Sequence, residues 1–409
     1  MKGKLPLTAS SAVLAICAAA MVPVQATAQG ASKQELSAAD YCSLVKDPSA
    51  RKICFAARDQ YYSNQYRAAL FTIRQAVAAA PTEGGVRAMS ATIMIALGDE
   101  GSAERELREA RKNGAMDHVV LAALLPLMIR RHEEEQLLVE FPEPAPGAKG
   151  DGAADILFGR AKALVSLDRL PEAASELDRS LTLRRDAAGL VVRAQIADRQ
   201  NDHLLAAKLV DEAVQREPKS APAALAKLTQ IQGFGDPAKT LAFSQQMLDV
   251  FPGVIEFRLA RIEAFLRMNQ DGKAQAEVAA LQAKVPNSNF ARYYNGLLLV
   301  RANKKTAAWQ VMQAIPPQFV RQNPSLAISM AQLAVETGHI DMGAAFLISA
   351  LSAAPELVDV RFQLASLRMQ QDSPQAALTT LQPIMGSTDP RVQKLLGTIR
   401  ARIAKDRAF

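Results

Sequence analysis

The sequence predicts an all-α protein built as a solenoid, in which about ten helical hairpins follow one another along the chain. Two observations lead to this fold class. Pro218, Pro252 and Pro286 stand 34 residues apart, and the same interval separates Ala69 from Ala103, as expected when one supersecondary unit is repeated. The 409-residue chain is also rich in alanine and leucine, with only 5% aromatic residues. That composition suits helices that pack closely through small side chains.

The second helix of each predicted hairpin is marked by a position that is usually small and that recurs every 33 to 36 residues. The ten positions are Ala69, Ala103, Leu137, Ala173, Ala206, Thr240, Ala274, Ala308, Gly343 and Ala377. An apolar residue usually follows four positions later, as at Ile73 and Val278, and residues so spaced share one helix face. Proline closes many units because it cannot continue a helix. We therefore expect repeats over residues 50–140 and 153–389.

Two segments depart from the repeat. Residues 141–152, FPEPAPGAKGDG, are rich in proline and glycine, so we expect an irregular loop that ends the third hairpin early. A flexible joint between two solenoid sections and a tolerated surface insertion are both open interpretations. Residues 390–409 carry apolar side chains at helical spacing, which predicts one amphipathic capping helix. These apolar residues are Val392, Leu395, Leu396, Ile399 and Ile403.

The first 28 residues have the features of an export signal. A basic start precedes a short apolar stretch, and the small-x-small motif at residues 26–28 predicts cleavage between Ala28 and Gln29. Lipidation at Cys17 and an uncleaved membrane anchor are the other two interpretations. No later stretch approaches the roughly 20 apolar residues of a membrane span. We therefore expect an exported, periplasmic and soluble mature chain.

Two cysteines, Cys42 and Cys54, remain after removal of the leader, and an even pair in an oxidising compartment is most simply a disulfide. Asp47 and Pro48 predict a turn between them, so we expect the bond to staple a short hairpin at the N-terminal cap, residues 29–49. Closing a loop of this size is worth about 3 kcal/mol in chain-entropy terms. Free thiols, an intermolecular bond and a redox pair are the alternatives, although redox chemistry usually needs a CxxC spacing.

From about residue 50 the chain resembles the tetratricopeptide repeat family in its period and in the small, apolar and proline positions given above. It departs from the family elsewhere, because the early Trp is absent and the eighth-position Gly occurs only at Gly296. The resemblance implies a right-handed α-superhelix whose concave groove is lined by first helices and binds protein segments. More narrowly, exported and degenerate Ala- and Leu-rich repeats resemble those of bacterial exopolysaccharide and exosortase (PEP-CTERM) export systems.

The family's register places an apolar side chain at the fifth position of seven first helices, where the family lines its groove. These seven residues are Phe158, Val191, Leu225, Leu259, Tyr293, Ile328 and Phe362. One interpretation is a partly apolar groove for an extended or helical peptide. The other is that degenerate repeats pack more tightly and bury these positions.

Charge limits the class of partner. The chain has 48 basic and 41 acidic residues, and its basic excess is concentrated in residues 390–409, which does not fit an exported nucleic-acid-binding protein. The basic residues of this segment are Arg391, Lys394, Arg400, Arg402, Lys405 and Arg407. They form either a surface for peripheral contact with an anionic membrane or a solvated cap.

Motifs for catalysis are lacking. The four histidines are isolated, and the sequence has no HExxH pair, GxSxG motif or phosphate-binding glycine loop. The acidic run after His132 fits the solvated start of a second helix, with a metal site as the other interpretation. We therefore expect no catalytic residue, metal or cofactor. The chain is interpreted as a non-enzymatic scaffold for envelope or periplasmic proteins, in exopolysaccharide assembly or an exosortase-linked system. The alternative is a cell-wall-acting enzyme or a direct activator of a peptidoglycan hydrolase.

Mass spectrometry of the intact protein from the periplasm tests the leader and the cysteines together. We expect a chain that begins at Gln29 and lacks the hydrogens that two thiols lose when they form a disulfide. A diacylglycerol-modified Cys17 at the N-terminus contradicts the soluble assignment. Free thiols at Cys42 and Cys54 under non-reducing conditions contradict the staple.

Overall fold

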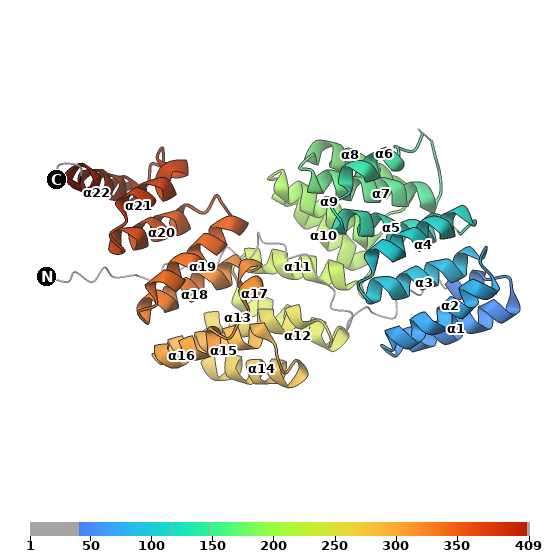
Figure 1. Cartoon of the computed structure of the whole chain (residues 1–409), viewed down its shortest axis with the longest axis horizontal. Coiled ribbons are helices and arrows are strands. Elements are labelled where there is room, and N and C mark those ends of the chain that lie inside the picture. The colour runs from blue at the N-terminus through green and yellow to red at the C-terminus, as the bar shows by residue number, and fades with distance from the viewer. Residues whose placement is uncertain (1–40, 116, 146, 407–409) are drawn as a thin grey trace. The chain divides into compact units, whose positions relative to one another are not determined.

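The computed structural model describes residues 41–406, apart from residues 116 and 146. The described part of the chain is helical and contains no strand, and its α-helices run from α1 to α22 (Figure 1). The export signal with its cleavage site and Cys17 lies outside the described residues, as does Arg407. The chain forms two compact units, divided between Gln230 and Ile231. Each unit is a succession of helical hairpins.

The described residues of the first unit form five hairpins, each made of a first and a second helix. They are α1 (Pro48–Tyr62) with α2 (Tyr66–Ala79), α3 (Gly84–Ala96) with α4 (Glu100–Lys112), α5 (Asp117–Arg130) with α6 (Glu134–Glu140), α7 (Asp151–Ser166) with α8 (Leu170–Leu183), and α9 (Ala187–Arg199) with α10 (His203–Arg216). The unit division falls within the next first helix, α11 (Ala221–Gly233).

The second unit continues the same order. Its helices are α12 (Pro237–Val250), α13 (Ile255–Arg267) with α14 (Asp271–Lys284), α15 (Asn289–Arg301) with α16 (Lys305–Met312), α18 (Pro324–Glu336) with α19 (Ile340–Ala353), α20 (Val358–Gln370) with α21 (Pro374–Leu381), and α22 (Pro390–Asp406). A short helix, α17 (Pro317–Arg321), is inserted after α16, because Pro316 and Pro317 stop that helix early.

The predicted period and phase are confirmed. Each of the ten positions named from the sequence is the fourth residue of a second helix, from Ala69 in α2 to Ala377 in α21. Nine of the ten are buried, and Ala206 is half-buried. A small side chain here lets the second helix approach the first closely, which is why this position keeps the period even where others have diverged.

The turn inside each hairpin carries a second periodic signal, which the sequence analysis missed. In each turn, the residue five positions before the fourth residue of the second helix has a positive φ between 54° and 88°. These residues are Asn64, Gly98, His132, Asp168, Asn201, Gly235, Asn269, Asn303, Gly338 and Asp372. Glycine, asparagine and aspartate tolerate this left-handed conformation best. His132 is the exception, and it holds a turn with its side chain in solvent.

The third hairpin ends early at α6, as the sequence predicts, and a loop over residues 141–150 follows. The last two residues of the expected loop, 151 and 152, already belong to α7. Arginines hold the first part of this loop in place. Arg160 of α7 donates to the carbonyl oxygen of Phe141 at 2.8 Å, and Arg179 of α8 donates to that of Pro144 at 2.9 Å. The Phe141 side chain is itself buried. The loop is therefore anchored to α7 and α8, and the unit division lies elsewhere, in α11.

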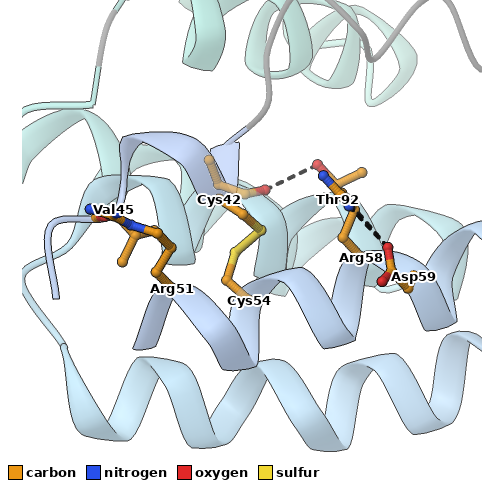
Figure 2. The surroundings of a disulfide bond; sticks show 8 residues. Cys42, Val45, Arg51, Cys54, Arg58, Asp59 and Thr92 are labelled. Atoms are coloured by element: carbon orange, nitrogen blue, oxygen red, sulfur yellow. Dashed lines mark hydrogen bonds and ion pairs between the residues drawn. A yellow bond between two sulfur atoms is a disulfide. The ribbon is translucent and has the colours of Figure 1, made fainter. Parts of the chain in front are cut away.

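A disulfide joins Cys42 to Cys54, with their Cα atoms 5.4 Å apart (Figure 2). Cys42 lies in a 3-10 helix over Tyr41–Leu44, and Cys54 lies in α1. Asp47 accepts a hydrogen bond from the backbone N–H of Ala50 and so caps α1 at the turn that the sequence predicts. Because α1 is the first helix of the first hairpin, the bond fastens the N-terminal segment to the repeats. The structure thus contains the expected pair and the expected turn, and it shows in addition that the second arm of the stapled hairpin is itself the first repeat helix.

The last helix, α22, buries one apolar stripe against the preceding hairpin. Four of its five expected apolar residues are buried, and Leu395 is half-buried. A single helix in this place covers the apolar face that the last hairpin otherwise leaves open. Within the described part of the chain, no helix combines the length and the apolarity that crossing a bilayer requires.

Replacement of the fully buried Ala274 in α14 by Trp tests the one-dimensional packing. We expect the larger side chain to overpack the crossing of α13 and α14 at a cost of about 1 to 3 kcal/mol or more. Because each hairpin contacts mainly its neighbours, amide protection is expected to fall most in α13, α14 and α15, and less with distance along the second unit. Hydrogen exchange read by mass spectrometry measures this gradient.

The matched control is Ala276→Trp, which adds the same side chain on the exposed side of the same helix. We expect this variant to keep the protection of the unmodified protein. An equal loss of protection throughout the second unit of Ala274→Trp would show a single cooperative core in place of a solenoid.

Candidate functional site

The seven expected groove residues lie on successive first helices, and every one is at least half-buried. Val191 and Ile328 are only 7% and 6% exposed, so the close packing of neighbouring helices leaves them no open surface for a partner. At these two positions the structure agrees with the second interpretation, in which degenerate repeats pack tightly and bury the side chain. The other five keep part of their surface accessible, namely Phe158, Leu225, Leu259, Tyr293 and Phe362. We refer to these five as the groove residues.

In the first unit, Phe158 of α7 lies beneath a cation. The ammonium group of Lys162, one turn later, is 5.6 Å from the centre of the ring, within the range of a cation–π contact. Burial lowers the pKa of Lys162, and the positive charge of Arg130 lowers it further. Lys162 forms no ion pair with any described residue. This part of the site is therefore apolar with one weakly solvated positive charge.

In the second unit, neighbouring helices hold the aromatic groove residues in fixed positions. The hydroxyl groups of Tyr293 in α15 and Ser329 in α18 share a hydrogen bond at 3.1 Å. The guanidinium group of Arg391, from α22, lies 5.4 Å from the centre of the Phe362 ring, and it also pairs with Asp359 of α20 at 2.7 Å. Side chains held in this way lose little entropy when a partner binds.

The expected basic surface of α22 is weaker than the sequence suggests. All five of its described basic residues are exposed, but Arg391 and Arg402 are each paired with two aspartates. Lys394, Arg400 and Lys405 form no ion pair with any described residue. Only these three basic side chains of α22 are therefore available to contact an anionic membrane surface.

A row of basic residues, which the sequence analysis missed, follows two positions after the expected groove positions. Each member pairs with an acid of a second helix at 2.5 to 2.7 Å. The pairs are Arg160–Glu176, Arg193–Asp178, Lys227–Asp211 and Arg261–Glu277. The signal was present in the sequence, because these basic residues recur every 33 to 34 positions. The pairing neutralises the charge of the row.

An enclosed carboxyl group lies between first helices of the second unit. Glu263 of α13 accepts a hydrogen bond from the hydroxyl of Tyr294 in α15 at 2.6 Å, and another from the side-chain amide of Gln232 in α11 at 3.3 Å. The stem of Glu263 is partly exposed, but its carboxyl is surrounded by protein. That burial raises the pKa of Glu263, while Tyr294 and Arg267 act in the opposite direction. The only sign of this site in the sequence is that Gln232, Glu263 and Tyr294 follow one another at intervals of 31 residues.

The histidines with described side chains make local contacts. His203 bonds to Asp198 at 2.6 Å on the surface, and the ring of His339 stacks on Trp309 with centroids 4.6 Å apart. In the described residues, no group of three His, Cys, Asp or Glu side chains is arranged to hold a metal ion. The acidic run after His132 starts α6, but Glu134 in it is buried rather than solvated as expected.

Comparisons with known proteins bear on the fold. No protein-family model matches the chain, and no curated protein matches it in sequence. Among solved structures, a human IFIT1 dimer with PPP-AAAA is similar with a TM-score of 0.52 at 13% identity, over 85% of this chain and 89% of that one. This similarity confirms the predicted fold class, an all-α solenoid of tetratricopeptide-like hairpins. At such low identity it shows the fold alone.

Other solved structures are more distant. Yeast Tom70 has a TM-score of 0.47 at 11% identity and covers 86% of this chain and 88% of that one. A tetratricopeptide repeat protein from Parabacteroides merdae has a TM-score of 0.41 at 15% identity, over 68% of this chain and 96% of that one. The structural neighbours are tetratricopeptide-repeat proteins.

The enclosed carboxyl of Glu263 gives a pH-dependent prediction. Its pKa is higher in the folded than in the unfolded protein, so its contribution to stability is present below the unfolded pKa, near 4.5, and is lost as pH rises through the folded pKa. Glu263→Gln removes the ionisation. We expect the variant to gain stability relative to the unmodified protein as pH rises through this window, and then to keep a constant advantage.

Urea unfolding of both proteins across the acid-to-neutral range measures this difference. Glu256→Gln removes a carboxylate from the first turn of the same helix and is expected to show no such gain. Stability curves for Glu263→Gln and the unmodified protein that run parallel at every pH contradict the assignment.

Proposed function

We propose that the chain is a non-enzymatic scaffold that binds a segment of another protein along its first helices. One observation carries this proposal: half-buried apolar side chains occupy the same position on successive first helices, in both units. Within each unit, repeated hairpins turn one such position into an extended surface. Aromatic residues held in place by neighbours, such as Tyr293 and Phe362, are the kind of anchor on which binding energy concentrates. An apolar surface of this kind suits a helical or extended peptide.

The cellular setting is a further part of the proposal. The leader features of residues 1–28 support export, and a disulfide between Cys42 and Cys54 persists in an oxidising compartment such as the periplasm. We therefore propose envelope or periplasmic proteins as partners. A role in exopolysaccharide assembly or an exosortase-linked system is supported by the sequence resemblance. The three unpaired cations of α22 add a peripheral contact with an anionic membrane.

The test begins with a photoreactive phenylalanine analogue in place of Tyr293, in the protein expressed in its own cells. We expect illumination to link this position to one envelope protein, because the side chain borders the proposed peptide surface. The matched control carries the analogue at Phe234, which is 76% exposed in the turn after α11. We expect no link to the same protein from that position.

The protein identified in this way is then used as the ligand for the double variant Tyr293→Ala with Phe362→Ala. We expect binding to weaken by about tenfold or more, equivalent to about 1.4 kcal/mol, while far-ultraviolet circular dichroism stays helical. Phe234→Ala is expected to bind as the unmodified protein does. Unchanged binding by the double variant means that both side chains belong to the core. Glycan cleavage by the purified protein contradicts the scaffold and favours the cell-wall enzyme.

A further inference from the structure

A cavity of about 380 Å³ lies between α2, α3 and α4 of the first unit. None of these helices carries a groove residue, so the proposed peptide surface does not account for the cavity. Its volume falls within the range of small-molecule sites, which is roughly 300 to 1,000 Å³. The cavity is therefore larger than a bare inorganic ion needs, and it has room for a small organic molecule.

Two arginines from different helices line this cavity, Arg74 from α2 and Arg105 from α4. Neither forms an ion pair with a described residue. The only acid in the lining is Glu106, and Arg87 of α3 already engages it at 2.9 Å. Two guanidinium groups at one cavity, with the lining carboxylate neutralised, favour a negatively charged occupant.

Arg105 is held by Ser102, a neighbour on α4 that also lines the cavity. Its guanidinium donates to the Ser102 hydroxyl at 2.9 Å. Asp99, which caps α4, accepts from the backbone N–H of Ser102. Hydrogen bonds from Ser102 lower the pKa of Asp99, and the charges of Arg105 and Arg74 lower it further. Asp99 is thus engaged in capping the N-terminus of α4. Its negative charge offsets part of the positive charge of the two arginines, but its side chain does not line the cavity.

The wall of the cavity combines the hydroxyl groups of Ser90 and Ser102 with apolar side chains. Ser90 of α3 is 1% exposed and lines the cavity, yet its hydroxyl forms no hydrogen bond with the side chains or backbone of any described residue. The Ser90 hydroxyl is therefore available to a polar group of a molecule that enters the cavity, because a hydroxyl can both donate and accept a hydrogen bond. Val77 and Met94 supply apolar surface beside it.

We propose that this cavity binds a small hydroxylated organic anion, with the chemistry of a uronic acid or a sugar phosphate. The carboxylate or phosphate lies between Arg74 and Arg105, because the planar guanidinium group matches both anions in geometry. A ligand hydroxyl pairs with Ser90, and the less polar face of the ligand packs on Val77 and Met94. The scaffold thereby has a small-molecule site that is separate from its peptide surface.

Isothermal titration calorimetry of the full chain tests this site with four probes, namely glucuronate, glucose 6-phosphate, neutral glucose and inorganic phosphate. We expect one or both acidic sugars to bind, and neutral glucose not to bind. Inorganic phosphate is expected to bind more weakly than the preferred sugar. Binding of glucuronate identifies a carboxylate as the anionic group, and binding of glucose 6-phosphate identifies a phosphate.

Three variants distinguish this site from general attraction of anions. We expect Arg74→Ala and Arg105→Ala each to lower the affinity for the sugar by about tenfold or more. We expect Ser90→Ala to lower this affinity by a smaller factor. Arg67→Ala removes an exposed arginine from α2 that does not line the cavity, and it is the matched control with unchanged affinity. Circular dichroism and thermal unfolding show that each variant is folded.

Several results overturn the proposal. The first is the absence of binding heat from both acidic sugars at about 10 mM, a concentration that reveals millimolar affinity. The second is an unchanged affinity for the sugar in folded Arg74→Ala. The third is binding of inorganic phosphate as tight as that of the sugars. Crosslinking at Tyr293 does not depend on any of these results, so the peptide-binding proposal and the small-molecule site fail or stand separately.

Discussion

The close crossing of the two helices within each hairpin is the constraint on which the rest of the structure depends. Where the fourth residue of the second helix is glycine, there is no room for a side chain. A methyl group added at Gly343 would lie 2.7 Å from Cγ2 of Val335 in the paired helix. The same limit acts from the other side, since a methyl group on Gly296 would lie 2.3 Å from Cγ of Met312. A fixed crossing point sets the hairpin geometry, and repeating it sets the direction in which hairpins stack.

Stacking of one hairpin on the next relies on apolar contacts and is oriented by exposed ion pairs. A residue at the end of a first helix, or in the capping helix, repeatedly reaches an acid 30 or 31 positions earlier. Such pairs are Arg130–Glu100, Arg199–Asp168, Arg301–Asp271 and Arg402–Asp372. Their side chains are at least one-third exposed, so each pair contributes little to stability. Their value lies in selecting one register between neighbouring hairpins, which keeps equivalent first-helix positions aligned.

That alignment explains how one position serves both packing and recognition. Phe362 packs under Arg391, so the capping helix that completes the core also braces an aromatic groove residue. Tyr293 is braced in the same way by its bond to Ser329 of the following first helix. A solenoid has no separate domain on which to build a site, so its binding residues are core residues that remain partly uncovered. Degenerate repeats differ in how much of each such residue they leave exposed, and this difference gives each stretch of the surface its own character.

The hairpin period, its phase and the capping helix follow from the amino-acid sequence, because these depend on local spacing and on the size of one residue such as Ala274. The left-handed turn residues carried an equally regular signal that was overlooked. Tertiary structure alone decided which groove positions stay open, why Val191 is covered, and how Arg160 anchors the loop after α6. It alone enclosed Glu263 and left Ser90 facing a cavity. Each of these features requires contact between side chains from different helices. The spacing of the repeats fixes the path of the backbone, but it does not fix which side chains come into contact.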